Sequence, residues 1–317
     1  MRQTTLAEGS FAKYKKATRK EQFLKQMDQI IPWSDLSKAI EPYYPKPKGS
    51  GRRPIGIERM LRIHFMQHWF NLSDPAMEEA LYDIAVMREF AGIDLGREAA
   101  PDETTICKFR HLLEKRNLGE ELFRLVNEYL AENNLFVSKG TIVDATLIDA
   151  PSSTKNKENS RDPEMHQVKK GNQWYFGMKA HIGVDSQSKL IHSVGVTAAH
   201  VHESHLLENL LHGEETVVWG DSAYSGQKET IKSCAPGAKD MTNRKGARYR
   251  QLSDQEHRSN RVKSKVRSKV EHVFRVMKCQ FGYTKVRYKG LAKNANHTFT
   301  NCALVNLYLA REKLVAT

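Results

Sequence analysis

The spacing of apolar residues changes near residue 140, and this change limits the possible folds more than any other feature of the sequence. Between residues 56 and 134, apolar residues recur at every third or fourth position, as in Ile57, Leu61 and Phe65, which is typical of amphipathic helices. After residue 140 they form short β-branched runs or alternate with polar residues, which is typical of strands. The sequence therefore predicts a helical region followed by a mixed α/β region.

Two of the expected helices begin with recognisable capping residues. Asp74 precedes Pro75, which gives an N-cap and a proline at the first helical position, and Asp102 can cap a further helix. We expect helices over residues 75–91 and 102–115. They could form a helix-turn-helix-like unit that reads a DNA groove, or belong to a plain helical bundle. The side chains that such a unit would present to DNA are Lys108, Arg110 and His111.

The second half of the chain alternates between strand-like and helix-like segments. Two alternating segments on either side of the sequence DSQS predict a hairpin. Strands are expected over residues 140–148, 174–184, 189–197, 216–221 and 238–243. Helices are expected over residues 203–212, from about 225, over 254–280 and over 295–313. Such runs build a mixed sheet with helices on its faces, so the predicted class is α/β preceded by an all-α region.

Composition along the chain suggests three parts. The first 53 residues are polar and basic and end in PKPKGSGRRP, a proline- and glycine-rich stretch typical of a linker. We therefore expect a basic arm and linker over residues 1–53, within which residues 21–42 carry a short helical pattern interrupted at Pro32. A helical domain, which could bind DNA, would follow over residues 54–136, and an α/β domain over residues 137–317.

The charge of the chain points to a polyanionic partner. It carries 50 Lys and Arg and 37 Asp and Glu, a net charge of +13, which indicates nucleic acid. Residues 244–278 alone contain twelve basic and three acidic residues. Such a run is often only a solvated surface, but here we expect it to hold DNA phosphates beside the acidic residues described below. The residues expected to contact DNA are Arg261, Lys263, Lys265, Arg267, Arg275 and Lys278.

An aromatic residue follows a polar segment, residues 151–172, that we expect to be a loop. Trp174 could stack on an unpaired base at a DNA end, or it could be a residue of the core. The sequence leaves both interpretations open.

The sequence has neither an apolar leader nor a run of about eighteen apolar residues. We therefore expect no membrane partner and a location in the cytoplasm, associated with the nucleoid. Its four cysteines form no C-x-x-C pair, which argues against a zinc ribbon and favours reduced thiols.

Three acidic residues lie where ordinary structure does not require them. Asp144 lies inside the apolar run TIVDATLI, Asp221 ends VVWGD, and Glu271 lies among many basic residues. A carboxylate on a buried strand is costly unless it is paired or bound to a metal, and ligand sites gather at the carboxyl ends of strands. Carboxylate oxygens suit Mg²⁺, and two such ions can support phosphodiester cleavage.

Each of these residues also has a simpler explanation. Asp144 could pair with a buried arginine or cap a turn, and Asp221 could N-cap the helix that follows it. Glu271 could form an ion pair with Arg267 or Arg275 on its own helix. Taken together, however, the three predict a metal-dependent catalytic site in which Asp144, Asp221 and Glu271 are the metal ligands.

The sequence around these residues resembles the insertion-sequence DDE transposases of bacteria, in the branch with an InsH-like helical N-terminal domain. The resemblance rests on TIVDATLIDAP around Asp144, GDSAY around Asp221 and RSKVEHVFRVMK around Glu271. The segments GRRPIGIERMLRIHFMQHWFNLSD and PDETTICKFRHLLE are similar to that N-terminal domain, so the resemblance spans about residues 45–310. The family has a Tyr-Arg-Glu-Lys signature. Its last three members are matched by Arg267, Glu271 and Lys278, and Ser264 stands at the tyrosine position.

This resemblance implies an RNase H-like catalytic domain over residues 137–317, in which the three carboxylates hold two Mg²⁺ ions that Mn²⁺ could replace. It implies a transposase that binds the inverted repeats of its element, cleaves the ends by hydrolysis and joins the freed 3′-OH to double-stranded target DNA. Joining two ends implies a homodimer or a larger assembly. Two alternatives stay open: a non-catalytic end-binding protein or regulator derived from a transposase, and a stand-alone nuclease of the same fold.

Overall fold

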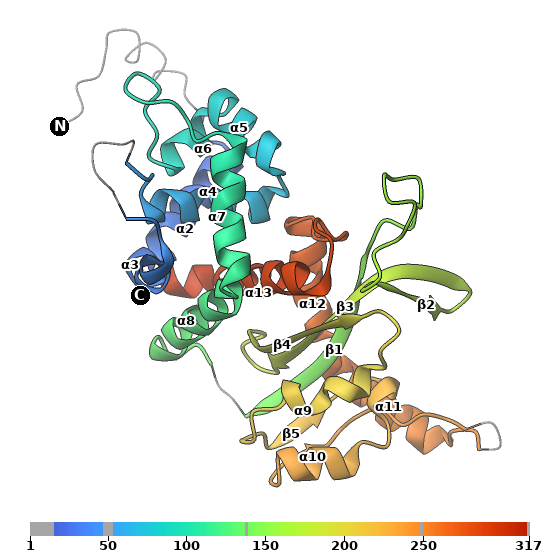
Figure 1. The fold of residues 1–317 in the computed structure, drawn as a ribbon. Coiled ribbons are helices and arrows are strands. Elements are labelled where there is room, and N and C mark those ends of the chain that lie inside the picture. The colour runs from blue at the N-terminus through green and yellow to red at the C-terminus, as the bar shows by residue number, and fades with distance from the viewer. Residues whose placement is uncertain (1–15, 47–52, 137–138, 248–249, 316–317) are drawn as a thin grey trace.

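The computed structural model places a group of helices beside a mixed sheet that is itself flanked by helices (Figure 1). It describes residues 16–46, 53–136, 139–247 and 250–315. The predicted fold, an RNase H-like mixed sheet flanked by helices and preceded by a helical region, is confirmed. Within the described residues, no helix is both long enough and apolar enough to cross a membrane.

The helical region contains seven α-helices within the described residues before the first strand. Their bounds are α2 (Arg19–Ile30), α3 (Trp33–Ile40), α4 (Ile57–Phe70), α5 (Asp74–Asp83), α6 (Ala85–Phe90), α7 (Glu103–Lys115) and α8 (Leu118–Glu132), and a 3₁₀ turn, η1 (Glu41–Tyr43), follows α3. Ser73, not Asp74, caps α5 with its side chain, whereas Asp102 caps α7 as expected. The helix expected over residues 75–91 is divided at Ile84, whose backbone is extended.

The first two described helices, α2 and α3, lie inside the segment predicted as a basic arm and meet at Pro32. Leu24, Met27, Leu36 and Ile40 are buried in the main core, because α2 packs on the C-terminal helix and α3 packs on α4 and α8. The helical pattern of residues 21–42 is therefore present, but the sequence did not predict its burial, because charged residues separate the apolar ones. Residues 1–15 and 47–52 of the predicted arm and linker lie outside the described residues.

The sheet has six strands, in the order β2-β3-β1-β5-β6, with β4 also paired to β3. Their bounds are β1 (Gly140–Asp149), β2 (His166–Lys170), β3 (Gln173–Asp185), β4 (Ile191–Ala198), β5 (Val217–Trp219) and β6 (Lys239–Asp240). Strands β1 to β4 are joined by antiparallel pairing, whereas β5 is parallel to β1 and to β6. The predicted hairpin of β3 and β4 is therefore present. Strand β2 lies in the segment 151–172 that we expected to be a loop.

The two faces of the sheet pack on different elements. Ile142 and Ile148 of β1 belong to the main core, which they share with Val270 and Val273 of α12 (Lys269–Arg275). Val143 of β1 instead packs into a smaller core on the other face. That face is covered by η2 (Glu203–Leu206), α9 (Leu207–Leu210), η3 (Ser222–Tyr224) and α10 (Lys228–Cys234), of which Figure 1 shows α9 and α10 below the sheet.

The long basic helix expected over residues 254–280 is broken into three pieces. Helix α11 (Asp254–Arg267) begins at a capping box formed by Ser253 and Glu256. It ends at Ser268, whose hydroxyl donates to the carbonyl of Lys265, a local contact that bends helices. Helix α12 follows and continues into a π-helical turn, η4 (Val276–Gln280).

The C-terminal helix α13 (Leu291–Val315) joins the two regions of the molecule. It packs against α2 and α8 of the helical region and against β4 of the sheet (Figure 1). The side chain of Asn306 accepts from the backbone N–H of Ile191 at 2.8 Å and donates to Asn127 of α8 at 2.8 Å. The helical region and the sheet therefore share one core. The predicted domain boundaries at residues 54 and 137 stay predictions.

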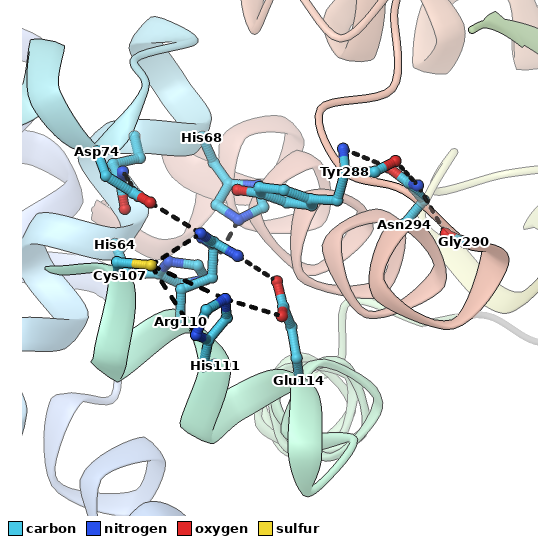
Figure 2. Close-up of polar contacts among 11 residues, drawn as sticks. His64, His68, Asp74, Cys107, Arg110, His111, Glu114, Tyr288, Gly290 and Asn294 are labelled. Carbon is cyan, nitrogen blue, oxygen red and sulfur yellow. Dashed lines mark hydrogen bonds and ion pairs between the residues drawn. The ribbon is translucent and has the colours of Figure 1, made fainter. Parts of the chain in front are cut away.

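A buried arginine forms a second joint between these regions (Figure 2). Arg110 of α7 donates to Asp74 at 2.8 Å and to Glu114 at 2.7 Å, and its guanidinium lies 4.2 Å from the ring centre of Tyr288. The side chain is 9% exposed. The interpretation of Arg110 as a residue that faces a DNA groove is therefore wrong, whereas Lys108 and His111 are exposed.

Candidate active site

Asp144 lies on β1, and Asp221 lies at the same level just after the neighbouring parallel strand β5. Ile142 of β1 is paired with Trp219 of β5, and this is the last pair between the two strands. Asp144 and Asp221 each follow two residues later, where the strands have parted. This is the edge at which ligand sites form in open α/β sheets. Strand register thus brings together two carboxylates that are far apart in the sequence.

Asp144 is a buried carboxylate with two strong partners. It is 7% exposed, and it accepts from the backbone N–H of Ala145 at 2.8 Å and from the guanidinium of Arg267 at 2.7 Å. Burial raises the pKa of Asp144 to about 7, against the opposing effect of Arg267, and the negative charges of Asp221 and Glu203 act in the same direction as burial. Burial therefore disfavours the charged form of Asp144 in spite of these two partners.

Arg267 connects Asp144 to Glu271. Besides its bond to Asp144, its guanidinium donates to Glu271 at 2.9 Å, one turn further along the chain. The Glu271 side chain is otherwise open, at 62% exposed. The ion pair with an arginine that the sequence suggested for Asp144 and the one that it suggested for Glu271 are thus both present. Arg267 forms both of them and places its positive charge between the two carboxylates.

Asp221 also performs a local structural role. Its side chain accepts from the backbone N–H of Ala223 at 2.8 Å and so caps the short turn η3. This is the capping role considered for it from the sequence. Asp221 also interacts electrostatically with Asp144, because its charge contributes to the raised pKa of that residue.

The donor atoms fit a hard divalent cation, although they are not gathered into a finished site. Within the part of the chain that the structure describes, no three histidine, cysteine or acidic side chains lie close enough to hold a metal ion as they stand. Asp144, Asp221 and Glu271 offer only carboxylate oxygens, which Mg²⁺ prefers. A cation, the guanidinium of Arg267, already lies between two of them. The carboxylates therefore already bind one positive charge. Arg267 would have to move before Asp144, Asp221 and Glu271 could bind the same metal ion.

Comparison with known proteins decides the family. A family model described as Transposase DDE domain matches residues 136–307, more than half of the chain. The chain belongs to the DDE transposase family. A second model, described as Transposase domain (DUF772), matches residues 12–112. DDE transposases are DNA-transposing enzymes that typically use divalent metal ions. The expected resemblance is confirmed.

One solved structure is similar to this transposase over most of its length. It is a piggyBac transposase synaptic complex with hairpin DNA, determined by cryo-EM. The similarity covers 92% of this chain and 73% of that chain, with 9% sequence identity and a TM-score of 0.46.

Two of the predicted DNA-contacting lysines of the transposase are anchored to its own backbone. Lys278, on the π-helical turn, donates to the carbonyl of Leu147 at 2.6 Å, and burial lowers its pKa. Lys263 donates to the carbonyl of Thr242 at 2.8 Å, and burial lowers its pKa as well. Ser264, at the signature's tyrosine position, accepts from the side chain of Asn243 at 3.0 Å. These contacts fix the segment that carries Arg267 and Glu271 against the sheet.

The remaining predicted DNA contacts of the transposase lie at its surface. Arg261, Lys265 and Arg275 are exposed. Trp174 is 64% exposed on β3, where it is paired with Lys169 of β2. The interpretation of Trp174 as a core residue is therefore wrong, and the stacking interpretation stays a prediction.

Glu203 is a site-adjacent residue that the sequence analysis did not single out. It lies after the end of β4 in a polar, histidine-rich stretch, and no local pattern distinguishes it there. It lies on η2, which packs against η3, the turn that follows Asp221, and its charge contributes to the raised pKa of Asp144.

The raised pKa of Asp144 predicts an unusual dependence of stability on pH. The folded chain binds a proton at Asp144 up to about pH 7, whereas the unfolded chain loses it near the ordinary value of 3.8. The free energy of unfolding in metal-free buffer should therefore fall as pH rises between these values. The upper bound is about 4 kcal/mol, since one pKa unit corresponds to about 1.4 kcal/mol.

The variant Asp144→Asn, which is neutral at every pH, should remove this loss. It should unfold at a higher temperature than the wild type at pH 8, and the difference should shrink towards pH 4. Thermal unfolding followed by circular dichroism measures both. Glu208→Gln, an exposed acid on α9, is the control and should track the wild type. A wild type that is more stable than Asp144→Asn at pH 8 would contradict the raised pKa.

Proposed function

We propose that this protein is the transposase of an insertion sequence. It would bind the terminal inverted repeats of its element, cleave the ends by metal-dependent hydrolysis and join the freed 3′-OH to target DNA. The observation that carries the proposal is the placement of Asp144 and Asp221 at the parting of two parallel strands, with Glu271 tied to Asp144 through Arg267. Membership of the DDE transposase family supports it.

Asp144, Asp221 and Glu271 would hold Mg²⁺, with Mn²⁺ as a substitute. Two bound ions would stabilise the attacking and the leaving oxygen of phosphodiester cleavage. Asp144 would contribute the oxygen now bonded to Arg267, and Glu271 would approach from the helix side of the sheet. Burial of Asp144 would exclude bulk water from one side of the reacting phosphate.

Arg267 would exchange partners when the site is loaded. In the structure its guanidinium satisfies Asp144 and Glu271 at 2.7 and 2.9 Å. A divalent cation on the same carboxylates would compete with it, and the freed guanidinium would bind a DNA phosphate through charge-assisted hydrogen bonds. Lys278, held at the end of β1 by Leu147, lies on the same side of the sheet and would add a second positive charge.

Double-stranded DNA is the partner that the exposed basic residues near this site would hold. Neutralising Arg261, Lys265 and Arg275 together with glutamine should make DNA binding less dependent on salt. The slope of log Kobs against log salt concentration should become shallower by about 2 to 3, since each lost phosphate contact removes about 0.9. Fluorescence anisotropy with labelled duplex at several salt concentrations measures this slope. A matched triple variant at Lys228 and Lys232 of α10 and Lys239 of β6, which are all exposed, should change it little. Equal slopes in both variants would count against DNA at this surface.

The test of the function uses the DNA that flanks the gene. Duplexes that carry the flanking inverted repeats are incubated with the full chain and Mg²⁺ or Mn²⁺, together with a target plasmid. We expect nicks at the repeat ends followed by covalent joining of the ends to the plasmid. Since two ends are joined, we also expect a complex with at least two protein copies, which can be counted by light scattering. Binding without nicks at any Mn²⁺ concentration would indicate a non-catalytic end-binding protein, and cleavage without joining would indicate a nuclease.

A further inference from the structure

The segment that carries Glu203 lies tightly on the face of the sheet opposite α12. Two strand glycines make this possible, because they leave room where a side chain would stand. A Cβ atom at Gly195 of β4 would collide with Leu206 of η2, and one at Gly183 of β3 would meet the carbonyl oxygen of Leu210 of α9. The backbone around Glu203 is therefore fixed relative to β3 and β4.

Glu203 lies on η2, which packs against η3, the turn that Asp221 caps. The Glu203 side chain is 21% exposed. It forms an ion pair with Lys179 of β3, with 3.5 Å between Oε1 of Glu203 and Nζ of Lys179. Lys179 is paired with Leu147 of β1, an odd number of residues from Asp144, so the two side chains lie on opposite faces of the sheet. The charge of Glu203 acts on Asp144, and the charge of Asp221 acts on Glu203. Three carboxylates thus interact across the place where β1 and β5 part.

A buried hydroxyl lies on the turn that Asp221 caps, and its ring packs with Val143, the neighbour of Asp144. Tyr224 of η3 is fully buried, and its hydroxyl oxygen has no hydrogen-bond partner among the described residues. The charges of Glu203, Asp144 and Asp221 all act on this phenol. Buried hydroxyls in folded proteins are nearly always hydrogen-bonded, so a hydroxyl without a partner beside three acids indicates a ligand position there.

We propose that Glu203 is a further acidic residue of the active site, which strengthens divalent-cation binding at Asp144 and Asp221 from the face of the sheet opposite Glu271. This inference rests on the function proposed above. Glu203 would be a positioning residue, because it acts on the cation together with the two aspartates, and Lys179 would offset its charge before the cation binds.

An ordinary structural ion pair does not explain the position of Glu203. Its contact with Lys179 is longer than the 2.7–2.9 Å, roughly, of a charge-assisted hydrogen bond. The ammonium of Lys179 is already held by the carbonyl of Val201 at 2.9 Å. Burial raises the pKa of Glu203, Lys179 opposes this, and Asp221 adds to it. Like charges gathered in a partly buried place are typical of functional sites, where a bound cation relieves the repulsion.

The experiment measures Mn²⁺ binding by the full chain without DNA, using the loss of the free-ion signal in electron paramagnetic resonance. Glu203→Gln should weaken the Mn²⁺ Kd by about 10- to 100-fold, the range found for residues that support metal ligands. Lys179→Met should tighten it, because a neighbouring positive charge is removed. Glu208→Gln, an exposed acid on α9, is the matched control and should leave it unchanged. Circular dichroism checks that each variant is folded.

The outcomes separate this inference from the proposed function. If Asp144→Asn and Asp221→Asn weaken Mn²⁺ binding but Glu203→Gln does not, this inference is overturned and the proposed function stands. If the two aspartate variants also bind Mn²⁺ like the wild type, both fail. Weaker binding by Lys179→Met would overturn the electrostatic explanation. Should Glu203→Gln not fold, Glu203→Ala decides, because it also removes the charge, and an unchanged Kd for it would overturn the proposal.

Discussion

Asp144→Asn, Asp221→Asn and Glu271→Gln should each reduce cleavage of repeat-end DNA by more than about 100-fold, while the Kd for the same DNA changes little. Each change keeps the size of the side chain and removes one carboxylate charge. Even residues that only support metal ligands cost about 10- to 100-fold when they are replaced, so the loss of a ligand should cost at least that much. DNA is held mainly through phosphate contacts to basic residues, which these changes leave in place. Single-turnover cleavage in Mg²⁺ and in Mn²⁺ measures the effect.

Two controls make this result specific. Glu208→Gln changes an exposed acid outside the site and should cut at the wild-type rate. The thermal unfolding of Asp144→Asn shows whether its inactivity reflects misfolding, since this variant should be at least as stable as the wild type at pH 8. Glu271 is the most informative position, because its exposed side chain has Arg267 as its ion-pair partner. A Glu271→Gln variant that cuts normally would show that Glu271 serves only to hold Arg267.

Arg110→Met should destabilise the folded chain by about 3–5 kcal/mol, the range for breaking a buried ion pair by removal of one partner. The change leaves the carboxylates of Asp74 and Glu114 buried, at 15% and 7% exposed, without their shared cation. It also removes the guanidinium from the ring of Tyr288, and so loosens the contact between α7 and the segment before α13 (Figure 2). Chemical denaturation followed by circular dichroism measures the loss.

The chain provides a matched control for this prediction. Arg124 of α8 also pairs with two acids, Glu121 and Glu128, but its side chain is 52% exposed. Arg124→Met should cost no more than about 1 kcal/mol, because exposed ion pairs contribute little. The combined variant Arg110→Met, Asp74→Asn and Glu114→Gln should recover part of the loss, since it removes the unpaired charges. If Arg110→Met and Arg124→Met lower the free energy of unfolding by the same amount, burial of the Arg110 ion pairs does not contribute to stability.

The periodicity of the sequence predicted the helices and most strands, and its failures have physical causes. The helical pattern of α2 and α3 was recognised, but these helices were placed in a basic arm and not in the core, because charged residues interrupt their apolar ones. Leu24 and Met27 are buried because a helix from the opposite end of the chain packs on them. Strand β2 was taken for a loop because His166–Lys170 is mostly polar and exposed at the edge of the sheet. No local pattern encodes either relation.

The sequence by itself determined the class of the fold, the family and the three acids that we propose as metal ligands. It did so because periodicity, strand ends and short motifs are properties of neighbouring residues. Tertiary structure alone decided that Arg267 stands between Asp144 and Glu271, that Arg110 is buried between the two regions, and that the charge of Glu203 acts on Asp144. These relations join residues from about 40 to more than 120 positions apart, and they depend on strand register and on how helices pack on each face of the sheet. The distances between these residues are set by the folded chain and cannot be derived from the local sequence around each residue.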